Sequence, residues 1–274
     1  MGNLIDSAVA LFPAEPCQEY LVGDVQDPPA DRTLDLSGRR LRRLPPRLCA
    51  FTALLRLYLS DNRLSRLPAE LSRLSRLHTL ALDFNTFSEM PPAVCRLRGL
   101  SVLYLGNNRL SDLPAELSAL TDLRALWIET NRFEALPRVV CRLRRLSALH
   151  AGDNQLSALP EQLVQLRQLQ RLWISGNLLS HFPAVLLRMD SLELIDVDRN
   201  GIRLFPSLVG LPRLQLVVYD RNPCTNAPRV APGVRRVGRW AADSPPSTSP
   251  PPRRGRGAGA PPPESRDVEA AEKV

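Results

Sequence analysis

The chain has 274 residues, of which 36 are lysine or arginine and 28 are aspartate or glutamate, so its formal net charge is +8. Hydrophobic residues make up 44% of the chain, which is enough for a folded core and excludes a wholly disordered protein. No segment reaches the ~18–20 consecutive apolar residues of a membrane span, so we expect no transmembrane segment.

Residues 1–31 show no repeat. The apolar residues between positions 4 and 12 have helical spacing and Pro13 ends the run, so we expect residues 1–31 to form an N-terminal capping segment. Gly2 raises the question of N-myristoylation, but Asp6 stands where that motif has Ser or Thr, which argues against it.

A proline then returns every 23 residues, and an asparagine keeps the same step in another phase. Seven identical proline spacings are not expected of an ordinary globular domain, so residues 32–222 are predicted to be a stack of one repeated unit. The prolines are Pro45, Pro68, Pro91, Pro114, Pro137, Pro160, Pro183 and Pro206. The asparagines are Asn62, Asn85, Asn108, Asn131, Asn154, Asn177 and Asn200, with Asn222 one residue early.

Aligned on the asparagine, each unit reads L-x-L-x-x-N-x-L-x-x-L-P-x-x-L-x-x-L, which is the leucine-rich repeat pattern. The L-x-L alternation predicts one short strand per unit, giving nine parallel strands with their leucines inward. Because proline fixes φ and lacks a donor, it starts a return path that suits one short helical or 3₁₀ turn. The predicted fold is an α/β leucine-rich repeat solenoid, a horseshoe with strands on its concave face, short turns on its convex face and a cap at each end.

We interpret the repeated asparagine as structural, because its amide can satisfy backbone groups where the chain leaves each strand. A second period of two units runs through the core positions. It is visible in Phe87 and Phe133, and in cysteines at positions 49, 95 and 141. Neighbouring coils are therefore predicted not to be interchangeable. Cysteines two coils apart would be roughly 10 Å from one another, too far for a disulfide, so we expect reduced thiols and an intracellular protein.

Residues 223–240 are predicted to be a C-terminal capping segment. Val234, Val237 and Trp240 have three-residue spacing, which suggests one side of a closing helix with the intervening arginines outside. A solvated basic face is the favoured interpretation, and a docking patch for an acidic partner is the alternative. No aromatic residues alternate with the arginines, so no nucleic-acid partner is expected. The arginines of this candidate basic docking patch are Arg235, Arg236 and Arg239.

Residues 241–274 are rich in Pro, Ser, Gly and Ala and have little to bury, so we expect a disordered tail. Ser244 and Ser249 each precede a proline and are candidate sites of proline-directed phosphorylation. The C-terminal Glu-Lys-Val matches a PDZ-binding motif only loosely, which argues against that interpretation.

Nothing in the sequence assembles a catalytic site. The three histidines, at positions 78, 150 and 181, stand in no metal-binding spacing, and no Cys-x-x-Cys, P-loop or serine elbow occurs. We therefore expect a protein that is not an enzyme and that has no cofactor and no bound metal.

The strongest functional signal lies between the two strand leucines, where side chains project to the concave surface coil after coil. Large aromatic residues and a histidine fill this column, and carboxylates flank it, which is the composition of protein-binding hot spots. Packing of the aromatics on one another is the structural alternative. The candidate protein-binding residues are Tyr58, Asp83, Tyr104, Trp127, Glu129, His150, Asp153, Trp173, Asp196 and Asp198.

The 23-residue unit with Leu-Pro after its asparagine resembles the intracellular Ras-group class of leucine-rich repeats. Strings such as Ala81-Leu82-Asp83-Phe84-Asn85 and Leu126-Trp127-Ile128-Glu129 narrow the resemblance to a cardiac family of that class, over about residues 1–240. The resemblance implies a heart-muscle protein of the sarcomeric cytoskeleton, near the Z-line, that associates with actin and α-actinin and is sometimes nuclear. It offers no catalytic residues.

Two functions are compatible with the sequence. The first is a monomeric, non-enzymatic scaffold that docks a cytoskeletal or sarcomeric protein on its concave face. The second is a signalling adaptor whose concave carboxylates meet a small GTPase or a protein phosphatase. A nucleotide-dependent partner would favour the second function.

Overall fold

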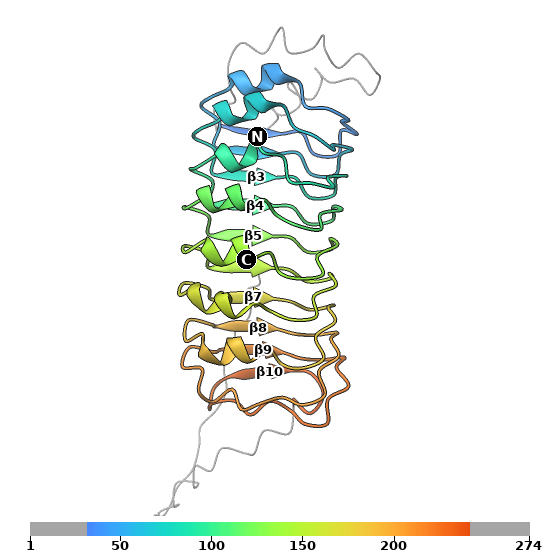
Figure 1. Ribbon diagram of the computed structural model, residues 1–274, viewed down its shortest axis with the longest axis vertical. Coiled ribbons are helices and arrows are strands. Elements are labelled where there is room, and N and C mark those ends of the chain that lie inside the picture. Colours follow the sequence, from blue (N-terminus) through green and yellow to red (C-terminus); the bar gives the residue numbers. More distant parts are fainter. Residues whose placement is uncertain (1–31, 242–274) are drawn as a thin grey trace, which may run out of the picture. The chain divides into compact units, whose positions relative to one another are not determined.

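The computed structural model describes residues 32–241. The expected N-terminal cap, the tail and the candidate phosphorylation sites Ser244 and Ser249 lie outside these residues. Ten parallel strands form one sheet in sequence order, and 3₁₀ turns lie on the opposite side of the coils (Figure 1). The strands are β1 (Thr33–Asp35), β2 (Arg56–Tyr58), β3 (Thr79–Ala81), β4 (Val102–Tyr104), β5 (Ala125–Trp127), β6 (Ala148–His150), β7 (Arg171–Trp173), β8 (Leu194–Asp196), β9 (Leu216–Val218) and β10 (Arg235–Val237).

The return path of most coils contains one short 3₁₀ turn. Pro45 and Pro68 have extended backbone, with φ of −62° and −67°, and their carbonyls accept the first hydrogen bond of the turn that follows. The predicted leucine-rich repeat solenoid is thus confirmed. The turns are η1 (Pro46–Ala50), η2 (Ala69–Arg73), η3 (Val94–Arg96), η4 (Ala115–Ala119), η5 (Arg138–Arg142), η6 (Glu161–Gln165) and η7 (Ala184–Arg188).

The core is a continuous column of inward leucines that runs through all the described coils. Strand leucines pair in register at the 23-residue step, as Leu57 does with Leu80 and Leu80 with Leu103, and all three are 0–1% exposed. Phe87 and Phe133 are completely buried in alternate coils. Each coil therefore buries its apolar side against its two neighbours, which is how a unit of 23 residues becomes stable.

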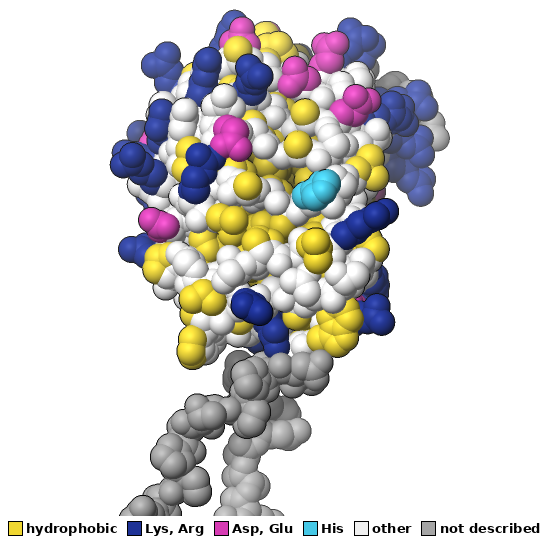
Figure 2. All heavy atoms as spheres, turned by 60° about the horizontal axis from the view of Figure 1, so that its bottom comes forward, with side chains coloured by type: hydrophobic (Ala, Val, Ile, Leu, Met, Phe, Trp, Pro, Cys, Tyr) yellow, Lys and Arg dark blue, Asp and Glu magenta, His cyan; other side chains and the backbone are white. Residues whose placement is uncertain are grey.

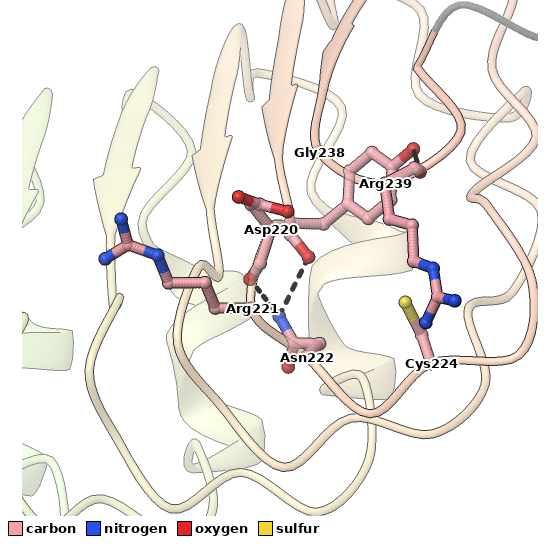
Figure 3. A pocket seen from close by; sticks show the side chains of 7 residues that line it. Asp220, Arg221, Asn222, Cys224, Gly238 and Arg239 are labelled. Carbon is pink, nitrogen blue, oxygen red and sulfur yellow. Dashed lines mark hydrogen bonds between the residues drawn. The ribbon is translucent and has the colours of Figure 1, made fainter.

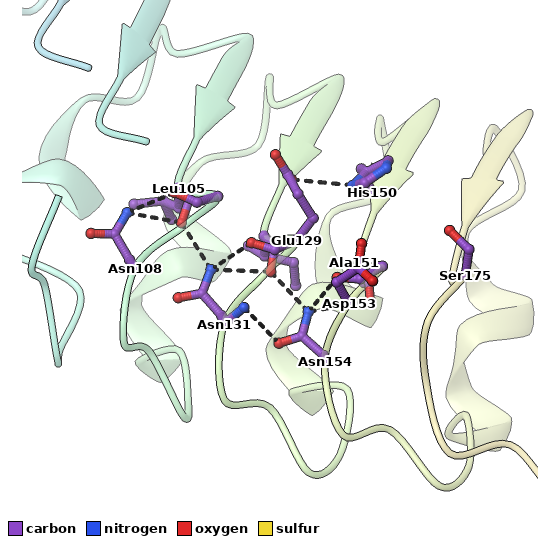
Figure 4. A network of polar contacts seen from close by, with 12 residues as sticks. Leu105, Asn108, Glu129, Asn131, His150, Ala151, Asp153, Asn154 and Ser175 are labelled. Atoms are coloured by element: carbon purple, nitrogen blue, oxygen red, sulfur yellow. Dashed lines mark hydrogen bonds and ion pairs between the residues drawn. The ribbon is translucent and has the colours of Figure 1, made fainter. Parts of the chain in front are cut away.

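The repeated asparagines are structural, as predicted. The Nδ2 of Asn131 donates to the carbonyls of Leu105, Ile128 and Glu129 at 2.9–3.1 Å (Figure 4). Its Oδ1 accepts from the backbone N–H of Leu110 at 2.9 Å. The amide thus links its own coil to the preceding coil. Equivalent contacts recur from Asn62 to Asn222, so each repeated asparagine supplies partners to backbone groups at the corner where the chain leaves its strand.

The predicted closing helix is wrong, and so is the count of nine strands. Residues 235–237 form a tenth strand, β10, in which the N–H of Arg235 donates to Gln215 and the carbonyl of Val237 accepts from Tyr219. The physical reason is the backbone edge of β9, whose donors and acceptors need partners that a helix cannot supply.

The new strand also separates the three arginines of the predicted basic patch. Arg236 takes the register position of the buried Val217, and Val237 takes that of Val218 in the concave column. The Arg239 guanidinium lies 4.7 Å from the centre of the Trp240 ring. Alternation along a strand places Arg235 and Arg236 on opposite faces, so these side chains do not share one helix face.

The residue before each repeated asparagine, and Gly38 at the same position of the first unit (before Arg39), has left-handed backbone, with φ between 47° and 69°. A residue other than glycine costs the folded state roughly 1–2 kcal/mol in this conformation, and a β-branched residue fits it worst. Only two of the nine positions hold glycine. The set is Gly38, Asp61, Phe84, Asn107, Thr130, Asp153, Gly176, Arg199 and Arg221.

Thr130→Gly is therefore expected to raise the free energy of unfolding by about 0.5–1 kcal/mol, because relief of the left-handed strain outweighs the greater freedom of glycine in the unfolded chain. The Thr130 side chain is exposed, so little packing is lost. Urea-induced unfolding followed by circular dichroism measures the change. Thr79→Gly, in strand β3, is the control and should destabilise. A loss of stability in Thr130→Gly equal to that of the control would contradict the explanation.

Candidate functional site

Four ring side chains form a continuous stack on the concave face, one on each of the strands β4 to β7. Ring centres are 5.7 Å apart for Tyr104 and Trp127, and 5.2 Å apart for Trp127 and His150. Trp127 and Trp173 lie two strands apart, yet their rings are stacked at 5.5 Å. Strands are spaced by about 4.8 Å, so the two indoles lean toward one another beside His150. All four side chains are half-buried.

The stack has defined ends. Toward the N-terminus the small, buried Ala81 separates Tyr104 from Tyr58. Toward the C-terminus the column continues with Asp196 and then with Val218. The predicted aromatic column is therefore contiguous over four coils, with Tyr58 set apart from it.

A second concave column, two residues further along each strand path, carries the carboxylates. Asp83 accepts a hydrogen bond from the Ser60 hydroxyl at 2.7 Å. Glu129 folds back over Gly106, where an added Cβ would lie 2.2 Å from Glu129 Oε1. Its Oε2 lies 3.2 Å from Nδ1 of His150 without hydrogen-bond geometry, and both atoms are buried without a hydrogen-bond partner (Figure 4).

Asp196 continues the aromatic column as a half-buried carboxylate beside Trp173. Burial raises the pKa of Asp196, and the negative charge of Asp198 adds to this effect. The backbone N–H of Asp198 donates to Asp196 Oδ1 at 3.0 Å and opposes the rise. A carboxylate that is ionised where burial disfavours its charge does not stabilise the folded state. Groups with perturbed pKa values of this kind concentrate at functional sites.

Asp196→Asn is expected to stabilise the protein at pH 7. A carboxyl whose pKa in the folded state is raised above its usual 3.8 binds its proton more strongly in the folded state than in the unfolded state. Its contribution to the free energy of unfolding is therefore full below pH 3.8 and is lost as the pH rises through the folded-state pKa. The uncharged amide avoids that loss and can still accept the Asp198 hydrogen bond. Thermal unfolding from pH 3 to 8 should show an advantage at neutral pH that disappears in acid. An advantage that persists below pH 3.8 would contradict this origin.

Asp153 lies outside these columns. Its carboxylate receives the Arg199 guanidinium, with Nη1–Oδ1 at 2.9 Å and Nη2–Oδ2 at 3.2 Å. The pair spans the intervening coil at Gly176, where a Cβ would lie 2.2 Å from Asp153 Oδ1. Arg199 also approaches Asp198 at 3.4 Å. Sequence spacing does not reveal this pair, because its members are 46 residues apart and on different coils.

A second polar region is a hollow of about 460 Å³ near the last coils (Figure 3). Side chains that line this hollow form hydrogen bonds with the backbone. Asn222 donates to the carbonyls of Tyr219 and Asp220, and the Tyr219 hydroxyl donates to the carbonyl of Arg239. Burial raises the pKa of the Cys224 thiol, which also lines the hollow. We find no nucleophile paired with a base there.

The other described cysteines are structural. Cys49, Cys95 and Cys141 are free and buried, and burial raises the pKa of each to about 11. Their thiols are therefore protonated at neutral pH and are poor nucleophiles. Within residues 32–241, no group of three His, Cys, Asp or Glu side chains is placed to hold a metal ion. No helix in the same range is long and apolar enough to cross a membrane.

Sequence reasoning missed several exposed apolar side chains. Phe84, Leu178 and Leu204 are 55%, 63% and 67% exposed. Figure 2, in which the C-terminal coils come forward, also shows hydrophobic side chains at the surface with charged side chains around them. Phe84 had a sequence signal, because other units hold Gly, Asn, Asp, Thr or Arg at its turn position.

Comparison with known proteins agrees with this architecture. Family profiles described as leucine rich repeat match residues 53–74 and 75–133. Among solved structures, a leucine-rich repeat protein of Leptospira interrogans superposes with a TM-score of 0.69 at 28% identity, covering 74% of this chain and 52% of that one. An internalin from Listeria monocytogenes gives a TM-score of 0.56 at 21% identity, covering 66% and 58%. The second likeness concerns the fold alone.

Three relatives that match over most of their length are far more similar. Leucine-rich repeat-containing protein 10 of Bos taurus is 72% identical over 256 residues, which cover 93% of this chain and 91% of the relative. The proteins of the same name from Mus musculus and Homo sapiens are 70% and 69% identical over 93% of this chain, covering 92% and 91% of their own lengths. Leucine-rich repeat proteins are typically non-enzymatic scaffolds for protein–protein interaction. The chain belongs to the family of leucine-rich repeat-containing protein 10.

Proposed function

We propose that this protein is a non-enzymatic adaptor that docks a protein partner on its concave face. The observation that carries the proposal is the half-buried stack of Tyr104, Trp127, His150 and Trp173. Tryptophan and tyrosine rings on a rigid element are the commonest anchors of protein interfaces, and contiguous exposed aromatic surface marks interaction sites. The sheet fixes the backbone of all four residues, so little conformational entropy is lost on binding.

The partner we propose is cytoskeletal. The resemblance to the cardiac family implies actin and α-actinin, a location in the sarcomere near the Z-line, and a further pool in the nucleus. Within residues 32–241 no cluster of side chains is placed to hold a metal ion, which is compatible with an adaptor. A single chain presents the whole aromatic stack, so the proposed active form is a monomer.

The test replaces two anchors at once. Trp127→Ala with Trp173→Ala in the full chain is expected to weaken co-sedimentation with actin filaments or α-actinin at least tenfold, since interface anchors each contribute about 2 kcal/mol or more. The matched control is Leu178→Ala with Leu204→Ala, which removes two exposed apolar side chains outside the aromatic column. The thermal transition of each variant is measured to establish folding. Binding that survives the tryptophan replacements in a folded protein would refute the concave site.

A signalling adaptor that binds a small GTPase or a protein phosphatase is the second candidate. The observation in its favour is the concave carboxylates Asp83, Glu129, Asp196 and Asp198, which would steer a basic surface toward the sheet. Their replacement by Asn or Gln should slow association at low salt and have little effect at high salt. A partner whose capture depends on GTP would support this candidate, and capture independent of nucleotide and of the carboxylates would refute it.

A further inference from the structure

We propose that the centre of the concave face binds an arginine side chain of the partner protein, with its guanidinium against the indole rings of Trp127 and Trp173 and paired with Glu129. The inference rests on the proposed function, because it assigns the chemistry of the partner at the same face. The occupant is a basic segment of another protein that presents at least one arginine.

The first observation is that, of the four concave carboxylates, the chain's own arginines approach only Asp198, which lies 3.4 Å from Arg199. The protein has 36 basic residues against 28 acidic ones, yet within residues 32–241 no arginine forms an ion pair with Asp83, Glu129 or Asp196. Their partners there are a serine hydroxyl for Asp83, the ring of His150 for Glu129, and a backbone N–H together with the Ser175 side chain for Asp196. In so basic a chain, an aromatic surface lined by unneutralised carboxylates selects a cation from outside.

The second observation is how Glu129 is positioned. Its carboxylate lies over Gly106, and a Cβ there would come within 2.2 Å of Oε1 and 2.5 Å of the carboxyl carbon. The glycine thus lets the carboxylate lie back along the sheet next to the ring stack. Asp83 stands in the same column one coil beyond Gly106, and Asp198 stands two coils beyond Gly152, past Ser175; both extend the acidic surface.

The third observation is a set of unused hydrogen-bonding atoms. Glu129 Oε2 is a buried acceptor without a hydrogen-bond partner, and Trp127 Nε1 is a buried donor without one. A carboxylate oxygen that lacks a donor is costly, and a charged donor is the strongest remedy. The Glu129 side chain is 21% exposed although Oε2 itself is buried, so the carboxylate must turn Oε2 outward to meet a ligand. A peptide supplies both needs, because its arginine donates to the carboxylate and a backbone carbonyl accepts from the indole.

The geometry selects arginine over lysine. A guanidinium is planar, stacks on an indole and presents two parallel N–H groups to one carboxylate. An ammonium makes a point contact and is more strongly hydrated. Because the stack lies directly beside the carboxylate, ring contact and ion pair can form with the same side chain.

The experiment uses three peptides and the full chain labelled with ¹⁵N. The peptides are acetyl-Gly-Ser-Gly-Xaa-Gly-Ser-Gly-amide, where Xaa is arginine, lysine or the uncharged isostere citrulline. The arginine peptide is expected to shift the indole N–H resonances of Trp127 and Trp173 and to leave Trp240 unchanged. Citrulline should weaken binding about tenfold or more, the loss expected for a charge-assisted hydrogen bond. Equal binding of the citrulline or the lysine peptide would overturn the assignment.

Variants locate the site. Glu129→Gln removes the charge, and Gly106→Ala keeps both charge and rings but displaces the carboxylate. Each should weaken the arginine peptide about tenfold. Glu134→Gln, at an exposed glutamate, is the matched control and should have no effect. Unchanged binding in Glu129→Gln would overturn the proposal even if Gly106→Ala failed to fold.

The outcome is separable from that of the proposed function. If the double tryptophan variant loses actin or α-actinin while Glu129→Gln retains them and the arginine peptide does not compete, concave docking stands and the arginine anchor is wrong. If the arginine peptide binds at Trp127 while the tryptophan replacements leave both proteins bound, the anchor stands and the proposed docking partners are wrong.

Discussion

Asn131→Ala is expected to lower the free energy of unfolding by about 2–4 kcal/mol, although it removes one small side chain. The N–H of Leu110 loses its only hydrogen-bond acceptor inside the protein, and a buried N–H without a partner costs roughly 1–3 kcal/mol. The three carbonyls served by Asn131 keep one partner each, from Asn108, Asn154 and the N–H of Asn107. They lose the second, and the void left by the amide adds to the cost.

Asn131→Asp distinguishes a loss of stability caused by missing hydrogen bonds from one caused by missing side-chain volume. A carboxylate still accepts from Leu110, but it places an oxygen against three carbonyl oxygens, so aspartate should destabilise more than alanine. Asn222→Ala is the internal comparison, because Asn222 is only partly buried and water can replace its contacts. Urea unfolding of all three variants measures the order. An aspartate variant as stable as the alanine variant would mean that the amide donors contribute little.

These asparagines show what the sequence determines well. A contact that recurs at a fixed 23-residue step appears in the sequence as a period, so strands, inward leucines, proline turns and the amide ladder were predictable from one unit. The structure of the closing segment was not predictable in this way, because that segment occurs only once in the sequence. Three-residue spacing of Val234, Val237 and Trp240 favoured a helix, but the unpaired edge of β9 required a strand. That requirement exists only in three dimensions.

The candidate site divides in the same way. The column position of Trp127, His150 and Trp173 followed from the period, because register carries each side chain to the same face. The direction in which an individual side chain points did not follow from the period. Asp153 was grouped with the concave carboxylates, but it turns to Arg199 across Gly176. Its own left-handed backbone, with φ of 50°, places it in the turn beyond the column, at the position that precedes each repeated asparagine.

Phe133→Ala is expected to lower the free energy of unfolding by about 3–5 kcal/mol, as for other fully buried phenylalanines. The ring fills a column in which consecutive coils are joined by backbone hydrogen bonds, from Arg132 to Leu110 and from Gln155 to Phe133. Phenylalanine and leucine alternate there as Leu64, Phe87, Leu110, Phe133 and Leu156, all completely buried. Every ring therefore has a leucine on either side. Chemical unfolding gives the loss, and Leu204→Ala at an exposed site is the control.

A swap tests whether that alternation matters. Phe133→Leu leaves a cavity, and Leu156→Phe overpacks a full coil at a cost of about 1–3 kcal/mol. Together they move one ring by one coil at constant total volume. If the adjoining coil yields the space that the new ring needs, the double variant should be more stable than the sum of the two changes by about 0.5–3 kcal/mol. Strict additivity would mean that each coil packs independently of its neighbour's side chain. A positive coupling makes the pair of coils the unit of packing, which is what the two-unit period in phenylalanine and cysteine predicts.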